Sequence, residues 1–334
     1  MPRMDQAPPT KKLVKLMIIG DGKIGKTHYA GEAARAGFNV LYLNGDVATQ
    51  TLATLDNEIQ RRIYLMEMGD TVKGGVRDPK FIRVMKELTT QITIRWNDTT
   101  QEIAKRSEKA DPIWELKPGK LDENTVLVID SWTSLVESMA QEAAIANGLD
   151  LATASTSQMR AVYQSTGARG TAILQIIRAI GCHVILICHP DEYQHKTAPE
   201  GKRIQDIKET EMIVDWTKMI PKSSSRPHGM LMSKYLTDVA WMEISPSGKE
   251  RRLNFTLRND RISGGHFDGV KSVDDYSFAN LVKQIGGTIP DGKQPIDHWL
   301  NIIEPGESVE AAEQILDGTQ KTEVKAKGFL GLAK

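Results

Sequence analysis

Short apolar runs, each ending at a glycine or a polar residue, recur along the chain and predict buried strands. The first two cover 13–19 and 38–44, and two more cover 126–130 and 182–188. A weaker run at 61–68 is a candidate for a further strand. Runs that are apolar on both faces are typical of parallel strands covered by helices on both sides. The pattern therefore predicts an α/β fold with a mainly parallel central sheet.

Helical spacing of apolar residues separates these runs. An alanine-rich segment at 26–36 stops at Gly37, a common helix-ending residue, and follows the first strand through a glycine-rich loop. Further helices are predicted at 79–91, 136–146, 171–180, 277–285 and 296–303. A late antiparallel hairpin is predicted from 240–245 and 251–258, which flank a Ser-Pro-Ser-Gly turn. Residues 96–117 show no clear pattern, and 191–229 predict a long polar loop.

Composition narrows the class of protein. The chain has 334 residues and no formal net charge, so any contact with nucleic acid must come from a local basic patch. Only two cysteines occur, Cys182 and Cys188, which favours a reducing compartment. No apolar stretch is long enough to span a membrane, and the first residues lack the apolar core of a signal peptide. We expect a cytoplasmic protein without a membrane partner.

The strongest motif is the segment GDGKIGKT, which fits the phosphate-binding pattern G-x-x-x-x-G-K-[ST]. Glycines let successive backbone N–H groups turn toward phosphate, the lysine reaches the β- and γ-phosphates, and the threonine hydroxyl ligates Mg²⁺. The alternative is a simple glycine-rich turn, but the strand before and the helix after favour a nucleotide site. The expected cofactors are ATP and Mg²⁺, bound by Gly20, Asp21, Gly22, Lys23, Ile24, Gly25, Lys26, Thr27 and His28.

Acidic and polar residues end three other predicted strands. Asp130 ends 126–130 at the sheet edge where such folds bind ligands, so we expect it to hold the metal with Thr27. Serine follows Asp130, so the residue that activates water must lie elsewhere. Asp46 is the candidate, with a plain turn residue as the alternative. His189 could touch the γ-phosphate and report its loss, with a structural histidine as the alternative.

These motifs resemble the RecA-like ATPase core, and within it the phage nucleotide-binding proteins of the single-strand-annealing type. The matching segments are GDGKIGKT, YLNGDVAT, TVLVIDSWTSL, HVILICHPDEY and WMEISPSGKERRLNFTLRNDR. The resemblance implies that Asp46 stands at the catalytic acid, usually glutamate, and that His189 stands at the sensor. Arg261 stands at the basic motif that relatives insert into a neighbouring subunit's nucleotide. It implies a homo-oligomeric ring or filament, and a location in the host bacterial cytoplasm if the chain is phage-encoded.

By the same resemblance, DNA-binding segments follow the metal-acid strand and the sensor strand, here at 137–169 and 191–226. Basic residues with interleaved tyrosines suit single-stranded DNA, because bases stack and phosphates pair. An ordinary solvated surface is the alternative, because acidic residues dilute the charge. The expected DNA-binding residues are Arg160, Tyr163, Arg169, Tyr193, Lys196, Lys202 and Arg203. A single-strand-binding protein is a further possible partner.

The expected organisation is a disordered lead at 1–12, a RecA-like ATPase core at 13–265, a small helical extension at 266–305, and a helix with a flexible tail at 306–334. The leading functional hypothesis is a DNA-stimulated ATPase, with Lys26, Asp46, His189 and Arg261 as catalytic residues, acting on single-stranded DNA in recombination, annealing or replication. A ring-type motor or loader acting on a protein is a second hypothesis. A small-molecule kinase is a third, which the absence of a compact arginine-bearing lid disfavours.

Overall fold

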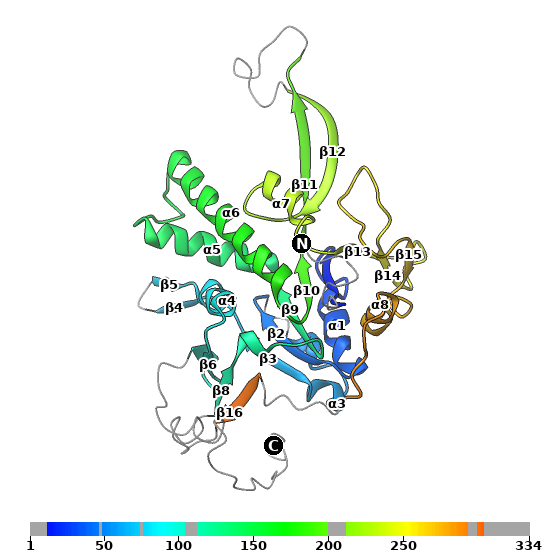
Figure 1. Cartoon of the computed structure of the whole chain (residues 1–334). Helices are drawn as coiled ribbons and strands as arrows, with labels where there is room; N and C mark the ends of the chain where they lie inside the picture. The colour runs from blue at the N-terminus through cyan, green and yellow to red at the C-terminus, as the bar shows by residue number, and fades with distance from the viewer. Residues whose placement is uncertain are drawn as a thin grey trace, which may run out of the picture.

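The computed structural model describes residues 12–46, 49–73, 76–103, 112–199, 212–292 and 299–303. Its centre is an eight-stranded sheet in the order β15-β14-β13-β1-β10-β9-β2-β3 (Figure 1). The six strands from β13 to β3 are parallel, and β14 and β15 add an antiparallel edge. The bounds are β1 Lys15–Ile19, β2 Asn39–Asn44, β3 Ile63–Glu67, β9 Thr125–Asp130, β10 His183–Cys188, β13 Asp238–Ile244, β14 Arg251–Asn254 and β15 Val270–Ser272. The predicted fold class, with its mainly parallel sheet and late hairpin, is confirmed.

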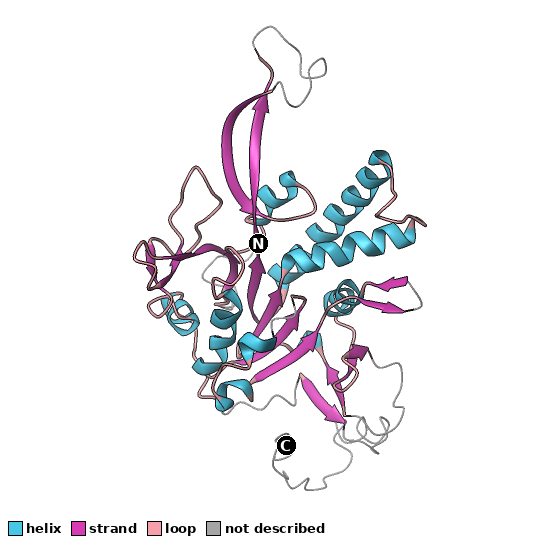
Figure 2. Cartoon of the chain, turned by 180° about the vertical axis from the view of Figure 1, so that it is seen from behind, coloured by secondary structure: helices cyan, strands magenta, loops and turns pink. Residues whose placement is uncertain are grey.

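Alternate residues of each central strand enter two separate cores. On β1, Met17 and Ile19 belong to one apolar cluster, whereas Leu16 and Ile18 belong to the other. This alternation follows from the two-residue period of a strand, and both clusters are buried because helices cover both faces of the sheet (Figure 2). The apolar runs in the sequence therefore correspond to strands that are apolar on both faces.

The helix after β1 changes character halfway along. It is α-helical over α1 (Lys26–Gly31) and continues as a 3₁₀ helix, η2 (Glu32–Ala36). Gly37 then ends it with a φ of 94°, a left-handed conformation that glycine adopts without a side-chain clash. The sequence predicted both the helix and its glycine end, but not the change to the tighter turn. With α8 (Phe278–Gln284), this segment covers one face of the sheet.

Helices α4 (Lys80–Thr90), α5 (Trp132–Ala146) and α6 (Thr156–Ala179) cover the other face. Helix α6 has 24 residues and begins fifteen residues before the predicted start at 171. The segment 137–169 therefore contains parts of two packed helices, of which the sequence predicted the first, at 136–146, and missed the start of the second. Ser155 and Gln158 form a reciprocal capping box at the start of α6, and this is the local signal that marks its true beginning.

The segment 191–229, predicted as a polar loop, contains regular structure. Strands β11 (Pro190–Thr197) and β12 (Ile213–Pro221) pair antiparallel, and α7 (Arg226–Met232) follows them. Figure 1 shows this hairpin extending away from the main sheet. The loop prediction was wrong because charged residues on this two-stranded ribbon interrupt the alternation of apolar and polar residues that usually marks a strand. The backbone N–H and C=O groups of β11 and β12 are satisfied by pairing with each other, which the sequence of either strand alone does not reveal.

A second sheet contains the segment that the sequence left unassigned. Its order is β16-β8-β6-β7, with β6 Ile94–Asn97, β7 Glu102–Ile103, β8 Ile113–Leu116 and β16 Leu300–Ile303. The helix predicted at 296–303 is wrong, because its described part is strand β16, paired with β8. A four-residue apolar run fits a helix turn as well as a strand, so only its partner decides.

The remaining elements are short. They are α2 (Thr49–Leu52), α3 (Asn57–Gln60), η3 (Pro118–Lys120) and a two-stranded pair of β4 (Thr71–Lys73) with β5 (Val76–Asp78). Residues 1–11 of the predicted lead and the whole of 306–334 lie outside the described residues. Within the described part, no helix combines the length and the apolar character needed to cross a membrane.

Candidate functional site

The register of the central strands brings the predicted site residues to one edge of the sheet. Ile19 at the end of β1 pairs with Cys188 of β10, and Asp130 at the end of β9 pairs with Asn44 of β2. The phosphate loop, His189, Asp130 and Asp46 follow these strand ends directly. Carboxyl ends of parallel strands form the ligand-binding edge of such sheets, so the sequence order predicted this meeting correctly.

The phosphate loop wraps around its own lysine. Gly25 has a φ of 105° and precedes α1, and Lys23 also lies in the left-handed region, at 63°. The Lys26 ammonium is almost fully buried and donates hydrogen bonds of 2.7 Å to the carbonyl oxygens of Gly20 and Asp21. Burial lowers the pKa of Lys26, and the nearby Asp130 carboxylate opposes that shift. An incoming phosphate would offer this ammonium a charged partner in place of carbonyls.

Thr27 and Asp130 lie together at the base of the loop. The Thr27 hydroxyl donates to Asp130 Oδ2 at 2.7 Å, and the Tyr42 hydroxyl donates to the same oxygen at 2.5 Å. Burial raises the pKa of Asp130, and these two hydrogen bonds act in the opposite direction. A hydroxyl beside a carboxylate fits Mg²⁺, which takes oxygen ligands, keeps several waters and shares the nucleotide's phosphates. When bound, the metal would neutralise charge on the phosphates.

A cluster of three acidic or histidine ligands would be expected for a metal held by protein alone. No such cluster occurs among the described residues.

Asp46 is held by three side chains from two neighbouring elements. Its Oδ1 accepts hydrogen bonds from the hydroxyls of Ser131, at 3.0 Å, and Ser134, and its Oδ2 lies 3.1 Å from His189 Nε2. Burial raises the pKa of Asp46, but the hydrogen bonds from His189, Ser134 and Ser131 outweigh burial and hold it below its usual value. The carboxylate is thus ionised and fixed beside the predicted sensor.

Arg261 is expected to reach the nucleotide of a neighbouring subunit, but its side chain is enclosed within its own chain. Its side chain is buried, ion-paired with Glu243 of the same chain, and its guanidinium lies 5.6 Å from the centre of the Trp241 ring. Arg258, three residues before Arg261, pairs with Asp260. Both arginines are paired within their own chain, and the role of Arg261 in a shared site stays a prediction.

The predicted DNA-binding residues fall into two groups. Arg160 and Tyr163 lie exposed on α6, whereas Arg169 forms an ion pair with Glu142 of α5. Tyr193 and Lys196 lie on β11. Lys202 and Arg203 lie outside the described residues.

Sequence reasoning missed three residues that the structure adds. Tyr42 supports Asp130 from the middle of β2, and Ser134 supports Asp46 from the first turn of α5. Trp216 lies on β12 and stacks on His195 with 5.1 Å between ring centres. A polar tyrosine inside an otherwise apolar strand was the available signal for Tyr42. No local pattern marked Ser134 or Trp216, because their partners are distant in the sequence.

Asp130→Asn is expected to remove most of the increase in ATP affinity that Mg²⁺ provides. The change keeps the size of the side chain but removes its negative charge. Losing a supporting ligand of this kind typically costs about 10–100-fold in metal affinity. Titration of ATP in Mg²⁺ and in EDTA, for the parent and the variant, measures the difference. Tyr42→Phe is the matched control, because it removes a hydrogen bond to Asp130 and keeps the carboxylate. An Asp130→Asn protein with the parent's full Mg²⁺ dependence would exclude Asp130 from the metal site.

Comparison with known proteins places this geometry in a family. The chain matches the family model described as "AAA domain" over residues 12–221, a range that includes the phosphate loop, Asp46, Asp130 and His189. Among solved structures, the crystal structure of the RadB recombinase is similar at 13% sequence identity with a TM-score of 0.33, over 74% of this chain and 82% of that chain. No curated protein matches the chain. The family match covers more than half of the sequence and contains the whole nucleotide site, so this chain belongs to the AAA-domain family of nucleotide-binding ATPases.

Proposed function

We propose that this protein hydrolyses ATP in response to single-stranded DNA and acts in recombination, annealing or replication, as phage recombination proteins do. The observation that carries the proposal is the position of the β11–β12 hairpin. It begins at Pro190, directly after His189, and His189 contacts the candidate water-activating residue Asp46. The projecting hairpin is thus joined directly to the nucleotide site through the consecutive residues His189 and Pro190.

In the proposed reaction, Lys26 holds the β- and γ-phosphates and the loop N–H groups surround them. Asp46 orients the attacking water and draws on its proton, while Ser131 and Ser134 keep the carboxylate in place. His189 lies between Asp46 and the start of β11, where it would form contacts with the γ-phosphate that are lost after hydrolysis. These roles need no movement of the central strands.

The described part of the hairpin has features that suit single-stranded DNA. Trp216 lies opposite His195 and stacks on it with an interplanar angle of 2°, and Tyr193 packs against the same tryptophan at 5.3 Å. Trp216 remains 40% exposed. An exposed aromatic face can stack with a base of any kind, and Lys196 and Lys218 on the same hairpin supply positive charge.

Coupling between the two sites follows from their connection along the chain. A shift of His189 on binding or losing the γ-phosphate would be passed to Pro190, the first residue of β11. DNA affinity would then depend on the nucleotide state, and DNA would in turn change the position of His189 beside Asp46. A ring or filament, with Arg261 released from Glu243 at a subunit interface, is the form in which we propose that the protein acts. A single-strand-binding protein is a proposed further partner.

A second candidate function is supported by a separate observation on the same hairpin. Ile213 and Val214 of β12 are 55% and 46% exposed, and apolar side chains of this kind are common in protein interfaces. Asp191, Glu192 and Asp215 also reduce the positive charge of the hairpin. The alternative is therefore a motor or loader whose hairpin contacts a protein.

Two sets of substitutions within 191–226 are expected to weaken single-stranded DNA binding in different ways. Trp216→Ala should cost about 1–3 kcal/mol, the contribution of one base stack, without changing the dependence on salt. Replacing Lys196, Lys202 and Arg203 together by alanine should flatten the plot of log affinity against log salt by about two units, since each phosphate contact contributes roughly 0.7. Fluorescence anisotropy with a labelled oligonucleotide and a non-hydrolysable ATP analogue measures both.

The matched control for the basic residues is a triple alanine variant of Lys249, Lys271 and Lys283, which are exposed and lie outside the hairpin. We expect this variant to keep the parent's salt dependence. A parent protein that binds no single-stranded DNA at low salt, with or without the ATP analogue, would contradict the proposed function and leave the hairpin as a protein-binding element.

A further inference from the structure

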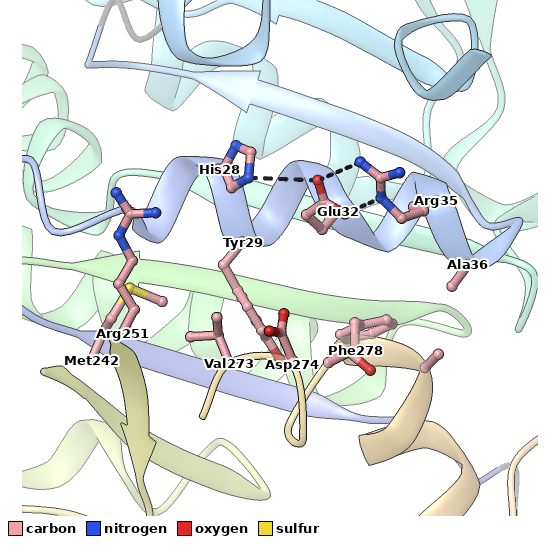
Figure 3. A pocket seen from close by; sticks show the side chains of 13 residues that line it. His28, Tyr29, Glu32, Arg35, Ala36, Met242, Arg251, Val273, Asp274 and Phe278 are labelled. Atoms are coloured by element: carbon pink, nitrogen blue, oxygen red, sulfur yellow. Dashed lines mark hydrogen bonds and ion pairs between the residues drawn. The ribbon is translucent and has the colours of Figure 1, made fainter. Parts of the chain in front are cut away.

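The nucleotide site is bordered by different structures on its two sides. On the β13 and β14 side, a cavity of about 600 Å³ adjoins the phosphate loop, and its lining includes Tyr29, Arg251 and Phe278 (Figure 3). Among the described residues, the Arg251 guanidinium forms no hydrogen bond or ion pair. On the other side, β9 ends at Asp130 and α5 begins two residues later, at Trp132. This second side leads to the foot of the β11–β12 hairpin.

Trp132, Ser223 and His228 form a hydrogen-bonded cluster, which we call the brace. The Trp132 indole Nε1 donates to Ser223 Oγ at 3.2 Å, and the same hydroxyl lies 2.6 Å from His228 Nδ1. The His228 imidazole also stacks on the Trp132 ring, with 6.2 Å between ring centres and 24° between ring planes. Because Ser223 Oγ accepts from Trp132, its own proton points to His228 Nδ1, which assigns the ring proton of the neutral imidazole to Nε2.

One end of the brace lies beside the residues proposed for hydrolysis. Trp132 is the first residue of α5 and follows Ser131, the N-cap of that helix. Ser131 donates a hydrogen bond of 3.0 Å to Asp46 Oδ1, and the residue before Ser131 is Asp130. The Trp132 side chain is fully buried. A shift of the indole would therefore move the backbone that places Ser131 against Asp46.

The other end of the brace belongs to the foot of the hairpin. Ser223 lies two residues after β12, whose last residue, Pro221, pairs with β11. Between them, the Lys222 N–H donates to the His189 carbonyl oxygen at 2.8 Å. The foot of the hairpin is thus held from two directions, by His189 through the backbone and by Trp132 through the brace.

Two glycines of α6 leave room for the brace and its neighbour Ser224. A side chain added at Gly170 would place its first carbon 2.9 Å from His228 Cε1 and 3.3 Å from Trp132 Cζ2. At Gly167 the same carbon would lie 3.3 Å from Ser224 Oγ. Figure 1 shows α7, which carries His228, between α6 and the foot of the hairpin. Glycine weakens the interior of a helix, so this close packing is obtained at the expense of local helix stability.

Two buried polar atoms at the brace have no hydrogen-bond partner among the described residues. They are His228 Nε2 and Ser224 Oγ, and each residue is only 7% exposed. An unpaired polar group away from water is unfavourable, so a rearrangement of the turn that pairs either atom would recover part of that free energy. The turn between β12 and α7 therefore has a physical reason to adopt a second arrangement.

We propose that Trp132 and Ser223 are positioning residues, and that the brace couples the nucleotide site to the hairpin. When single-stranded DNA moves the foot of the hairpin, the hydrogen bond between Trp132 and Ser223 passes the shift to the start of α5, and so to Ser131 and Asp46. Nucleotide binding moves the hairpin through the same connection, because coupling between two sites is reciprocal. The inference rests on the proposed function and assigns its coupling to a side-chain connection in addition to the backbone at His189.

The first test follows the hairpin without DNA. Backbone hydrogen exchange of the full chain, measured by mass spectrometry over β11 and β12, is compared with and without Mg²⁺ and a non-hydrolysable ATP analogue. In the parent, the analogue is expected to change hairpin exchange rates by about 5-fold or more, the lower end of typical coupling between sites. Trp132→Phe keeps a ring but removes the N–H donor, and it should abolish this response. Trp299→Phe is the matched control, because the Trp299 indole is also buried and its Nε1 has no partner among the described residues.

The second test uses Ser223→Ala, which removes the hydroxyl at the centre of the brace. It should lower the stimulation of ATP hydrolysis by single-stranded DNA about 5-fold or more, while ATP affinity and the rate without DNA stay at the parent values. It should also abolish the response of hairpin exchange to the ATP analogue.

The outcomes separate the brace from the proposed function. A parent hairpin that responds to the ATP analogue, with the response lost in both Trp132→Phe and Ser223→Ala, supports the brace even where DNA gives no stimulation. That combination would count against the proposed function alone. A parent hairpin that does not respond, or a response that both variants keep, would overturn the brace. An equal loss of ATP affinity in both variants would also overturn it, because the cluster would then only support the fold of the nucleotide site.

Discussion

Lys26→Ala is expected to lower ATP affinity at least about 30-fold. Removing one partner of a buried, hydrogen-bonded charge pair costs roughly 2–5 kcal/mol. The other lysine of the loop, Lys23, is exposed and cannot replace the buried Lys26. In the structure the Lys26 ammonium is already inside the loop, bonded to the Gly20 and Asp21 carbonyl oxygens, so it needs little movement to reach a bound phosphate. Titration with a fluorescent ATP analogue measures the loss.

Lys23→Ala is the matched control for this prediction. Lys23 belongs to the same loop, has the same charge and is exposed to solvent. Its replacement is expected to change ATP affinity little, because this position of the loop binds phosphate through its backbone N–H, and an exposed charge contributes about 0–1 kcal/mol. Circular dichroism establishes whether each variant keeps its fold. A folded Lys26→Ala protein with the parent's affinity would contradict the assignment of the phosphate site.

Asp46→Asn is expected to lower kcat by about 10²–10⁴-fold and to change ATP affinity much less. A residue that assists proton removal acts mainly in the transition state, so its loss appears in turnover. Asparagine keeps the size of the side chain and can still accept from Ser131, which limits damage to the surrounding contacts. Single-turnover hydrolysis and equilibrium binding of ATP, measured on the same preparation, separate the two effects.

Asp21→Asn serves as the comparison for Asp46→Asn, since Asp21 is an exposed carboxylate of the phosphate loop. It should turn over ATP near the parent rate. If Asp46→Asn hydrolyses ATP as fast as Asp21→Asn, then Asp46 is only a turn residue that forms a hydrogen bond with His189.

The lowered pKa of Asp46 also predicts the pH dependence of turnover. A lowered pKa means that the folded protein favours the ionised Asp46 carboxylate. The stability that this preference contributes is fully present above the pKa that Asp46 has in the unfolded chain. It is lost only as pH falls through the still lower value of the folded state. Protonation of Asp46 should therefore not limit kcat near neutral pH. A carboxylate of this kind orients water well but is a weak proton acceptor, which favours slow hydrolysis.

Much of the nucleotide site was predictable because its determinants are local. The phosphate loop needs a strand, a glycine-rich turn and a helix in immediate succession, and all three are contained in residues 13–36. Asp130, Asp46 and His189 each follow an apolar run directly, and the carboxyl ends of parallel strands share one sheet edge. Strand ends and loop chemistry were therefore enough to predict that these residues meet.

Contacts between distant segments were decided only by the tertiary structure. The 137–169 segment is helical because α5 and α6 pack on the sheet and on each other, and the 191–221 segment is a hairpin because β11 and β12 satisfy each other's backbone. Arg261 pairs with Glu243, eighteen residues earlier, across a hairpin whose geometry no local pattern specifies. The cavity of about 600 Å³ beside the phosphate loop likewise joins α1 to β14 and α8.

The sequence by itself thus determined the parallel strands, the phosphate loop and the chemical identity of the groups at the sheet edge. The tertiary structure decided which of these groups touch, such as Asp46 with His189 across 143 positions of sequence. It also decided which cations are left free, Arg251 in contrast to Arg261. The physical reason is that propensity and periodicity act over a few residues, whereas burial, pairing and charge neutralisation depend on partners that only the folded chain brings together.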